Sequence, residues 1–177
     1  MEFKKKDVKI FVLSGKARSG KDYTFSMIKD FYKDKKVIGL SFAYYIKDYA
    51  MRVSDWDGSE ETKPRELLQS IGIELVRTHI DPKLFIRRLL EDILVFSYFY
   101  DIIVVTDARL VDEVEALKEK FPESISIRLN RNIENGLNTS EKQHMTEVDL
   151  DNYDKFDYVV DSDEHLKEKI LEILKEV

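Results

Sequence analysis

The sequence predicts an α/β fold in three layers, with a parallel sheet of about five strands and helices on both faces. Three observations predict it. Short apolar segments rich in β-branched residues recur along the chain, stretches with helical periodicity separate them, and a glycine-containing loop joins the first apolar segment to the first helical stretch. Strands that alternate with helices are typical of βαβ units, whose strands run parallel.

The first expected strand, residues 8–14, reads VKIFVLS, a nearly continuous apolar run that is typical of a strand covered on both faces. The other expected strands are residues 37–41, 102–106, 125–129 and 158–160. Helices are expected over residues 21–33, 43–53, 64–79, 82–96, 111–120 and 164–176. Pro64 and Pro82 stand where two of these helices begin, a position that suits their fixed φ and missing N–H.

Composition indicates one domain over residues 1–177. With 43% apolar residues the chain is long enough for one substantial core. The polar stretches 54–63 and 130–143 lack apolar periodicity, so we expect loops, and residues 130–145 are expected to form a mobile lid.

Charge and residue usage exclude several classes of protein. There is no Cys, which removes disulfides and thiolate metal sites. The opening residues MEFKKKD are charged, and no apolar run approaches the ~20 residues that span a bilayer, so we expect a cytoplasmic protein without membrane contact. The net charge of -6 argues against general nucleic-acid binding, whereas a small anionic ligand needs only a local basic pocket. A monomer and a homodimer both stay open.

A phosphate-binding loop is predicted directly after the first strand. Residues 15–22 read GKARSGKD, which matches G-x-x-x-x-G-K with Asp22 where Ser or Thr is expected. Glycines let the backbone curl around phosphate oxygens, the helix start supplies a positive field, and Lys21 reaches the β and γ phosphates. Asp22 can hold Mg²⁺ only by a carboxylate contact, directly or through water. The predicted ATP-binding residues are Gly15, Lys16, Ala17, Arg18, Ser19, Gly20, Lys21 and Asp22; the alternative is an incidental glycine turn.

The strand at residues 102–106 ends in a second candidate site, since DIIVVTDAR places Asp107 and Arg109 at its carboxyl end, where ligands gather in parallel sheets. Asp107 could hold Mg²⁺ through water or accept the acceptor's proton, and Arg109 could neutralise charge on the transferring phosphoryl group. In the structural alternative, Asp107 caps the helix that begins near Val111, and Arg109 pairs with Asp112 or Glu113.

The helix at residues 64–79 carries candidates for binding the acceptor. Arg65, Gln69 and Gly72 share one helical face and could hold the acceptor's phosphate and base, although an ordinary solvated face would look the same. The opposite, apolar face is expected to consist of Leu67, Ile71 and Leu75.

Further candidates lie beside the expected lid. Arg128 near a strand end is expected to point to the site rim and, with Arg131, to clamp phosphates when the loop closes. His144, Thr146 and Glu147 follow the loop and could reach a bound ligand, although an isolated His is more often a surface residue.

Three separated blocks, SGKARSGKD, RELLQSIGIELVR and VVTDARLVDEVEAL, resemble one family. The chain resembles the phage-type deoxynucleoside monophosphate kinases, and it is similar to the animal type of phosphomevalonate kinase, a relative among the P-loop kinases. In both, the loop has the form R/K-S-G-K-D, so Asp22 fits the family pattern. The stretch HMTE matches the H-x-T-E of the phage kinases, whereas LDNYDKFDYVV looks more like phosphomevalonate kinase. Tyr23 departs from the Thr of the phage kinases, and Leu110 from a second Arg of the mevalonate relatives.

The resemblance implies a P-loop NTPase fold, Mg-ATP as donor and a lid with basic residues. The predicted function is ATP-dependent phosphoryl transfer to a small phosphomonoester, a (deoxy)nucleoside monophosphate ahead of phosphomevalonate. A nucleotide-binding regulatory protein without turnover is the alternative from another class. The predicted catalytic residues are Lys21, Asp107, Arg109 and Arg18; those for the acceptor are Arg65, Gln69, Arg128, His144 and Glu147; those for the metal are Asp22 and Asp107.

Overall fold

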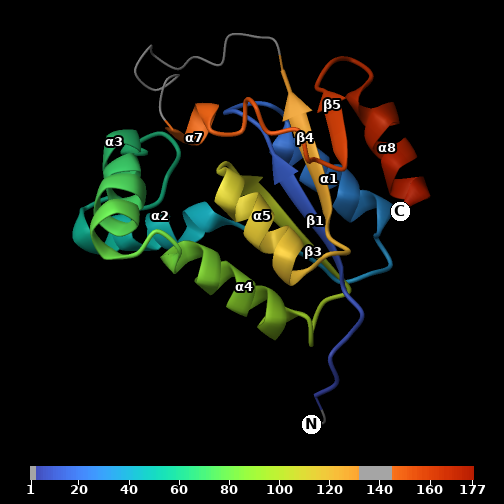
Figure 1. Cartoon of the computed structure of the whole chain (residues 1–177), viewed down its shortest axis with the longest axis horizontal. Helices are drawn as coiled ribbons and strands as arrows, with labels where there is room; N and C mark the ends of the chain where they lie inside the picture. The colour runs from blue at the N-terminus through green and yellow to red at the C-terminus, as the bar shows by residue number, and fades with distance from the viewer. Residues whose placement is uncertain (1–2, 132–144) are drawn as a thin grey trace.

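The computed structural model describes residues 3–131 and 145–177, and it confirms the predicted fold class. Five parallel strands form one sheet in the order β2-β3-β1-β4-β5 (Figure 1). The strands are β1 (Lys9–Ser14), β2 (Val37–Leu40), β3 (Ile102–Ala108), β4 (Ile125–Asn130) and β5 (Tyr158–Asp161). Because every strand is parallel, all of their carboxyl ends lie at one edge of the sheet.

Helices cover both faces of the sheet (Figure 1). They are α1 (Lys21–Phe31), α2 (Phe42–Val53), α3 (Arg65–Gln69), η1 (Ser70–Ile80), α4 (Leu84–Phe96), α5 (Val111–Lys120), α7 (Met145–Val148) and α8 (Leu166–Glu176). Alternation along β1 separates two cores: Ile10 and Val12 pack with α4 and α5, whereas Phe11 and Leu13 pack with α1 and α8. None of the described helices combines the length and apolarity needed to cross a bilayer.

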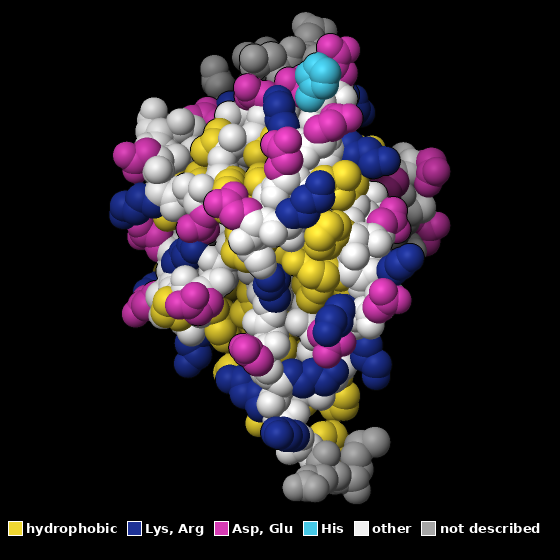
Figure 2. All heavy atoms as spheres, turned by 90° about the vertical axis from the view of Figure 1, so that its right-hand side faces the viewer, with side chains coloured by type: hydrophobic (Ala, Val, Ile, Leu, Met, Phe, Trp, Pro, Cys, Tyr) yellow, Lys and Arg dark blue, Asp and Glu magenta, His cyan; other side chains and the backbone are white. Residues whose placement is uncertain are grey.

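On the face where α8 lies, the described Lys and Arg side chains are interspersed with Asp and Glu, and apolar side chains show between them (Figure 2). The acidic side chains on this face are thus not gathered into one patch, and neither are the basic ones. This face therefore offers no focused cationic site in its described part.

The expected helix at residues 64–79 differs from the prediction. It is α-helical only through α3 and continues as the π-helix η1, whose end is marked by the Asp81 N–H, which donates to the Val76 carbonyl five residues earlier. The wider helix moves the next inward position from residue 75 to residue 76. Ile71 and Val76 are therefore buried, whereas Leu75 is 51% exposed, and its predicted place on the apolar face was wrong.

Strand register brings the candidate site together. Ser14 at the end of β1 is paired with Ala108 of β3 on one side and with Arg128 of β4 on the other. The loop that follows β1 therefore begins between the ends of these two strands, and Arg109 follows β3 directly. Segments about a hundred residues apart in sequence thus meet at one edge of the sheet.

Candidate active site

The loop between β1 and α1 has the backbone of a phosphate cradle. Gly15, Arg18 and Gly20 all have positive φ, at 153°, 60° and 98°. A Cβ on Gly15 would lie 2.6 Å from the backbone oxygen of Leu129, so the loop requires glycine there. Gly20 precedes α1 and supplies no side-chain cap, which leaves the first N–H groups of α1 for an anion.

Lys21 is folded back onto this loop. Its Nζ donates to the carbonyl oxygens of Gly15 at 2.7 Å and Lys16 at 2.8 Å, and the residue is only 8% exposed. Burial, together with the positive charge of Arg109, lowers the pKa of Lys21 to about 7. The charges that act in the opposite direction are those of Asp107, Glu147 and Asp22. Three of the four predicted catalytic residues, Lys21, Asp107 and Arg109, therefore share one electrostatic neighbourhood.

Asp107 caps a helix, but not the one that the structural alternative named. Its carboxylate accepts hydrogen bonds from the Ser41 hydroxyl at 2.8 Å and from the N–H groups of Phe42 at 2.8 Å and Ala43 at 2.9 Å. These groups are the start of α2, whereas α5 begins at Val111. Asp107 thus fixes the start of α2 against β3, and it also lines a cavity beside the phosphate loop.

The Arg109 guanidinium finds its partner outside α5. It forms an ion pair with Glu147, and neither Asp112 nor Glu113 is its side-chain partner. Only the backbone N–H of Arg109 contacts Glu113, at 2.8 Å. Asp112 pairs instead with Arg77.

Glu147 links Arg109 to the phosphate loop. One carboxylate oxygen pairs with Arg109, and the other accepts the Ala17 N–H at 3.0 Å. Glu147 is 8% exposed. A backbone amide of the loop and a guanidinium are both groups that bind phosphate, so Glu147 holds a place that suits a phosphoryl oxygen.

Arg128 does not lie at the rim where it was expected. It is buried, donates to the Ser14 hydroxyl at 3.1 Å, pairs with Asp151 at 3.3 Å, and lies over the ring of Phe156. Arg128 is absent from the described residues that line the cavity below. A strand that is buried on both faces draws its side chains inward, which explains the difference.

The other expected lid residues divide between described and undescribed parts of the chain. Arg131 donates to the carbonyl oxygen of Arg18 at 3.0 Å, so it contacts the phosphate loop. His144 and most of the expected lid lie outside the described residues.

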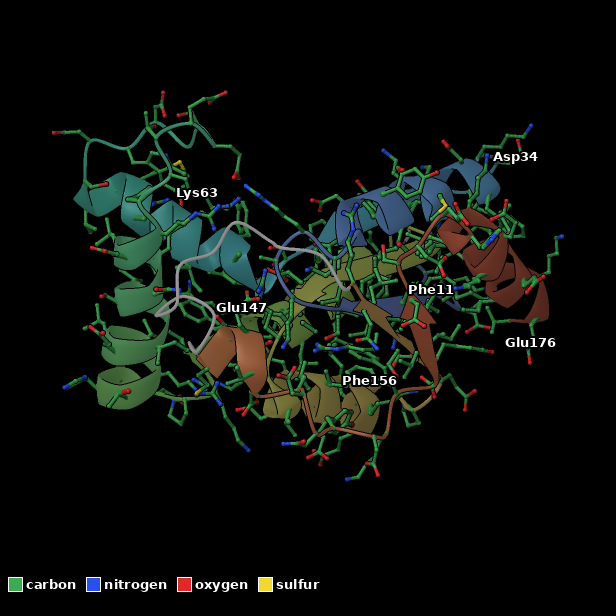
Figure 3. The ribbon with its side chains drawn as sticks, turned by 90° about the horizontal axis from the view of Figure 1, so that it is seen from above. Phe11, Asp34, Lys63, Glu147, Phe156 and Glu176 are labelled. Carbon is green, nitrogen blue, oxygen red and sulfur yellow. The ribbon has the colours of Figure 1, made fainter. Side chains whose placement is uncertain are left out.

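A cavity of about 220 Å³ opens beside the phosphate loop. Its walls come from α2, α3, η1, the start of α4 and the end of β3, and α7 adds the side nearest the loop. Figure 3 shows Lys63, beside α2 and α3, and Glu147, on α7, on different sides of this region. The sequence-predicted residues that line it are Ala17, Arg65, Gln69, Gly72, Asp107, Arg109, Thr146 and Glu147.

The outer wall of the cavity is rich in cations. Lys47 and Lys63 share one carboxylate, that of Glu60, at 3.3 and 2.9 Å. Arg65 has no ion-pair partner in residues 3–131 and 145–177. Arg77 also lines the cavity, and its charge is shared with Asp112. The wall therefore has positive charge available for an anionic ligand.

A second hollow lies on the other side of the phosphate loop. Gly20, Tyr23, Arg131, Ser162 and Leu166 are among its lining residues. The Tyr23 ring is 52% exposed there. An exposed aromatic ring beside a phosphate cradle can stack on a flat heterocycle.

No protein-family model matches the sequence, and no curated protein matches it. Solved structures do match. APS kinase from Mycobacterium tuberculosis, in complex with AMPPNP and APS, has a TM-score of 0.59 at 12% identity, with 96% of this chain and 97% of that chain covered. Shikimate kinase from Acinetobacter baumannii, in complex with shikimate, has a TM-score of 0.58 at 13% identity, with 97% and 95% covered. A gluconokinase from Sinorhizobium meliloti has a TM-score of 0.52 at 14% identity, with 96% and 91% covered.

The chain shares the fold of these three kinases. The three neighbours are named for different small molecules, so the shared fold does not select an acceptor. The resemblance to phage-type kinases stays a prediction.

In P-loop kinases, Mg²⁺ is held largely by phosphate oxygens and water, with few protein ligands. The described residues contain no group of three or more His, Cys, Asp or Glu side chains that could hold a metal by themselves. Asp22 is exposed in the first turn of α1, and Asp107 lies at the end of β3. The negative charges of both carboxylates raise the pKa of Lys21. Carboxylates are ligands that this hard cation prefers, and the assignment of Asp22 and Asp107 to a metal stays a prediction.

Sequence reasoning missed several residues of the site. Lys47 and Lys63 line the cavity but belong to no recognisable motif. Ser162 and Leu166 line the hollow beside Tyr23, although they lie near the opposite end of the chain. Glu113 had half of a usable signal, because an acidic residue three positions after the cap residue matches the second half of the capping box, whereas Leu110 lacks the hydroxyl of the first half.

Proposed function

We propose that this protein is an ATP-dependent phosphotransferase that phosphorylates a small phosphomonoester, with a (deoxy)nucleoside monophosphate as the first candidate. The observation that carries the proposal is the junction between loop and cavity. Ala17 of the phosphate loop lines the cavity, and Arg109 lies at the same place. A phosphoryl donor on the loop and an acceptor in the cavity would meet beside one guanidinium.

On the donor side, the triphosphate tail binds the loop amides and the start of α1. Lys21 exchanges its contacts with the carbonyl oxygens of Gly15 and Lys16 for phosphate oxygens, since a triphosphate restores the charge that burial disfavours. The base of ATP occupies the hollow beside Tyr23, where the exposed ring supports stacking.

Transfer itself needs positioning and charge stabilisation more than covalent chemistry. Arg109 leaves Glu147 and binds the transferring group, while Lys21 holds the donor side. Asp107 orients the acceptor from the end of β3. Mg²⁺, when bound with ATP, supplies charge neutralisation on the phosphate oxygens, and Asp22 and Asp107 are the carboxylates that would hold it through water.

On the acceptor side, the cavity offers groups for an anion and for a flat ring. Arg65 is without an ion-pair partner, and the Gln69 amide has no hydrogen-bond partner, in the described part of the chain. Phe42 and Phe85 supply apolar surface, and Phe85 stacks on Tyr45 with 8° between the ring planes. An amide that both donates and accepts beside aromatic side chains favours a nucleobase over the aliphatic chain of phosphomevalonate.

The test is ADP release in the presence of a panel of deoxynucleoside and nucleoside monophosphates, phosphomevalonate and phosphate-free nucleosides. We expect turnover with one phosphomonoester class, and Lys21→Ala abolishes it while the fold survives. Lys29→Ala, an exposed change on the same helix, is the matched control and keeps full activity. Nucleotide binding without acceptor-stimulated ADP release would refute the enzyme and favour a regulatory protein. Full activity in Lys21→Ala would refute the site.

A further inference from the structure

Glu113 is a buried carboxyl group on the wall of the acceptor cavity. It lies in the first turn of α5 and is 9% exposed. Within the part of the chain that the structure describes, it has no ion-pair partner. A buried acidic group without a cation is costly unless hydrogen bonds or a proton compensate it, so its contacts need an explanation.

Those contacts converge on the backbone that carries Arg109. The Glu113 Oε2 atom accepts the N–H of Arg109 at 2.8 Å and the N–H of Leu110 at 3.1 Å. These two residues form the turn between the end of β3 and the start of α5. Leu110 stands at the cap position of α5 and has no side-chain acceptor of its own. Glu113 therefore supplies the cap and fixes this turn at the same time.

The position of Arg109 matters because its side chain has to span the gap to the phosphate loop. Its guanidinium meets Glu147, which also accepts the Ala17 N–H. Arg109 is thus held at both ends: Glu113 binds its backbone N–H, and Glu147 pairs with its guanidinium. Loss of the backbone anchor would let the guanidinium drift from the place where the transferring group lies.

The charge state of Glu113 suits an anchor. Burial raises the pKa of its carboxyl to about 8, and the negative charges of Asp107 and Asp112 add to this effect. A neutral carboxyl group accepts N–H groups but does not attract the nearby guanidinium. The Arg109 guanidinium pairs instead with Glu147, which contacts the phosphate loop at Ala17.

We propose that Glu113 is a positioning residue for Arg109, which acts by holding the turn between β3 and α5 so that the guanidinium faces the phosphate loop. The role rests on the proposed phosphotransfer. It follows from the shared acceptor Oε2, from the burial of Glu113 and from the direction of the Arg109 side chain.

Two substitutions separate the anchor from a general effect on folding. In Glu113→Gln, an uncharged amide oxygen can still accept both N–H groups, so kcat stays within about twofold of wild type. In Glu113→Ala, both bonds are lost, and kcat falls on the order of 10- to 100-fold while the KM for ATP is unchanged. Equal losses of kcat in both variants would overturn the proposal.

A double-mutant cycle tests whether the effect passes through Arg109. Once Arg109→Ala has removed the guanidinium, adding Glu113→Ala should lower kcat no further. Fully additive losses would overturn the proposal, because Glu113 would then act elsewhere.

A measurement without turnover keeps this test separate from that of the proposed function. In the unliganded protein labelled with ¹⁵N-arginine, the Nε–H resonance that disappears in Arg109→Ala identifies this residue. We expect Glu113→Ala to shift that resonance and Glu113→Gln to leave it in place. An unmoved resonance in Glu113→Ala refutes the positioning role even if no acceptor is ever phosphorylated. A shifted resonance without turnover by wild type would support the anchor while the kinase proposal fails.

Discussion

The pKa of Lys21 gives a test of the donor site that needs no acceptor. Burial lowers this pKa from 10.5 to about 7. A shift of this size corresponds to about 5 kcal/mol of disfavoured positive charge. A bound triphosphate places several negative charges beside the ammonium group, so ligand binding should restore the proton.

The expected proton uptake follows from the two pH values compared. With a pKa of about 7, Lys21 is about 0.9 neutral at pH 8 and about 0.1 neutral at pH 6. Binding of a non-hydrolysable ATP analogue should therefore take up close to one proton at pH 8 and almost none through Lys21 at pH 6. Isothermal titration calorimetry in buffers of different ionisation enthalpy measures this number directly.

The ligand's own phosphates also exchange protons, and Lys21→Met provides the correction. Met is of similar length and carries no charge, so proton uptake by this variant comes from the ligand alone. Because the variant binds the ligand more weakly, its titration uses a higher protein concentration. The reasoning fails if wild type and Lys21→Met take up the same number of protons at pH 8. It also fails if uptake by wild type, after this correction, is as large at pH 6 as at pH 8.

Three further predictions concern stability and the acceptor. Between pH 7 and 10.5 the unfolded chain binds a proton at Lys21 that the folded protein does not. The free energy of unfolding without ligand should therefore rise with pH in this window. Urea titrations should show this increase for wild type and not for Lys21→Met. Asp107→Asn should lower the free energy of unfolding by about 2 kcal/mol, because an amide cannot accept all the bonds from the start of α2; Ser41→Ala, which removes one of them, should cost less. Arg65→Gln should raise the KM for the acceptor several-fold or more and leave the KM for ATP unchanged. The control Lys83→Gln, an exposed change outside the cavity, should change neither KM. An altered KM for ATP in Arg65→Gln would contradict the assignment of Arg65 to the acceptor.

The fold was predictable because its signals are local. Each strand is a short apolar run, and each helix follows with its own periodicity, so the parallel three-layer arrangement could be inferred before any contact was known. The π-helix η1 was not predictable. Its hydrogen-bond pattern differs from an α-helix by one residue, and its packing against Ala50 and Trp56 selects the inward positions Ile71 and Val76.

The candidate site divides in the same way. The phosphate loop and the strand end at Asp107 are contiguous motifs, and the face shared by Arg65 and Gln69 follows from helical spacing. The hydrogen-bond and ion-pair partners of these residues could not be inferred from the sequence. Asp107 caps a helix more than sixty residues earlier in the chain, and Glu147 reaches Ala17 across most of the sequence.

The sequence by itself determined the parallel sheet, the turn that can cradle phosphate and the charged residues that follow β3. Tertiary structure alone decided the direction of those charges: Arg109 toward Glu147, Arg128 inward to Asp151, and Glu113 onto the backbone of its own turn. The reason is that glycine content and apolar periodicity act within a few residues, whereas the partner of a buried charge is set by whichever segments the sheet order brings side by side.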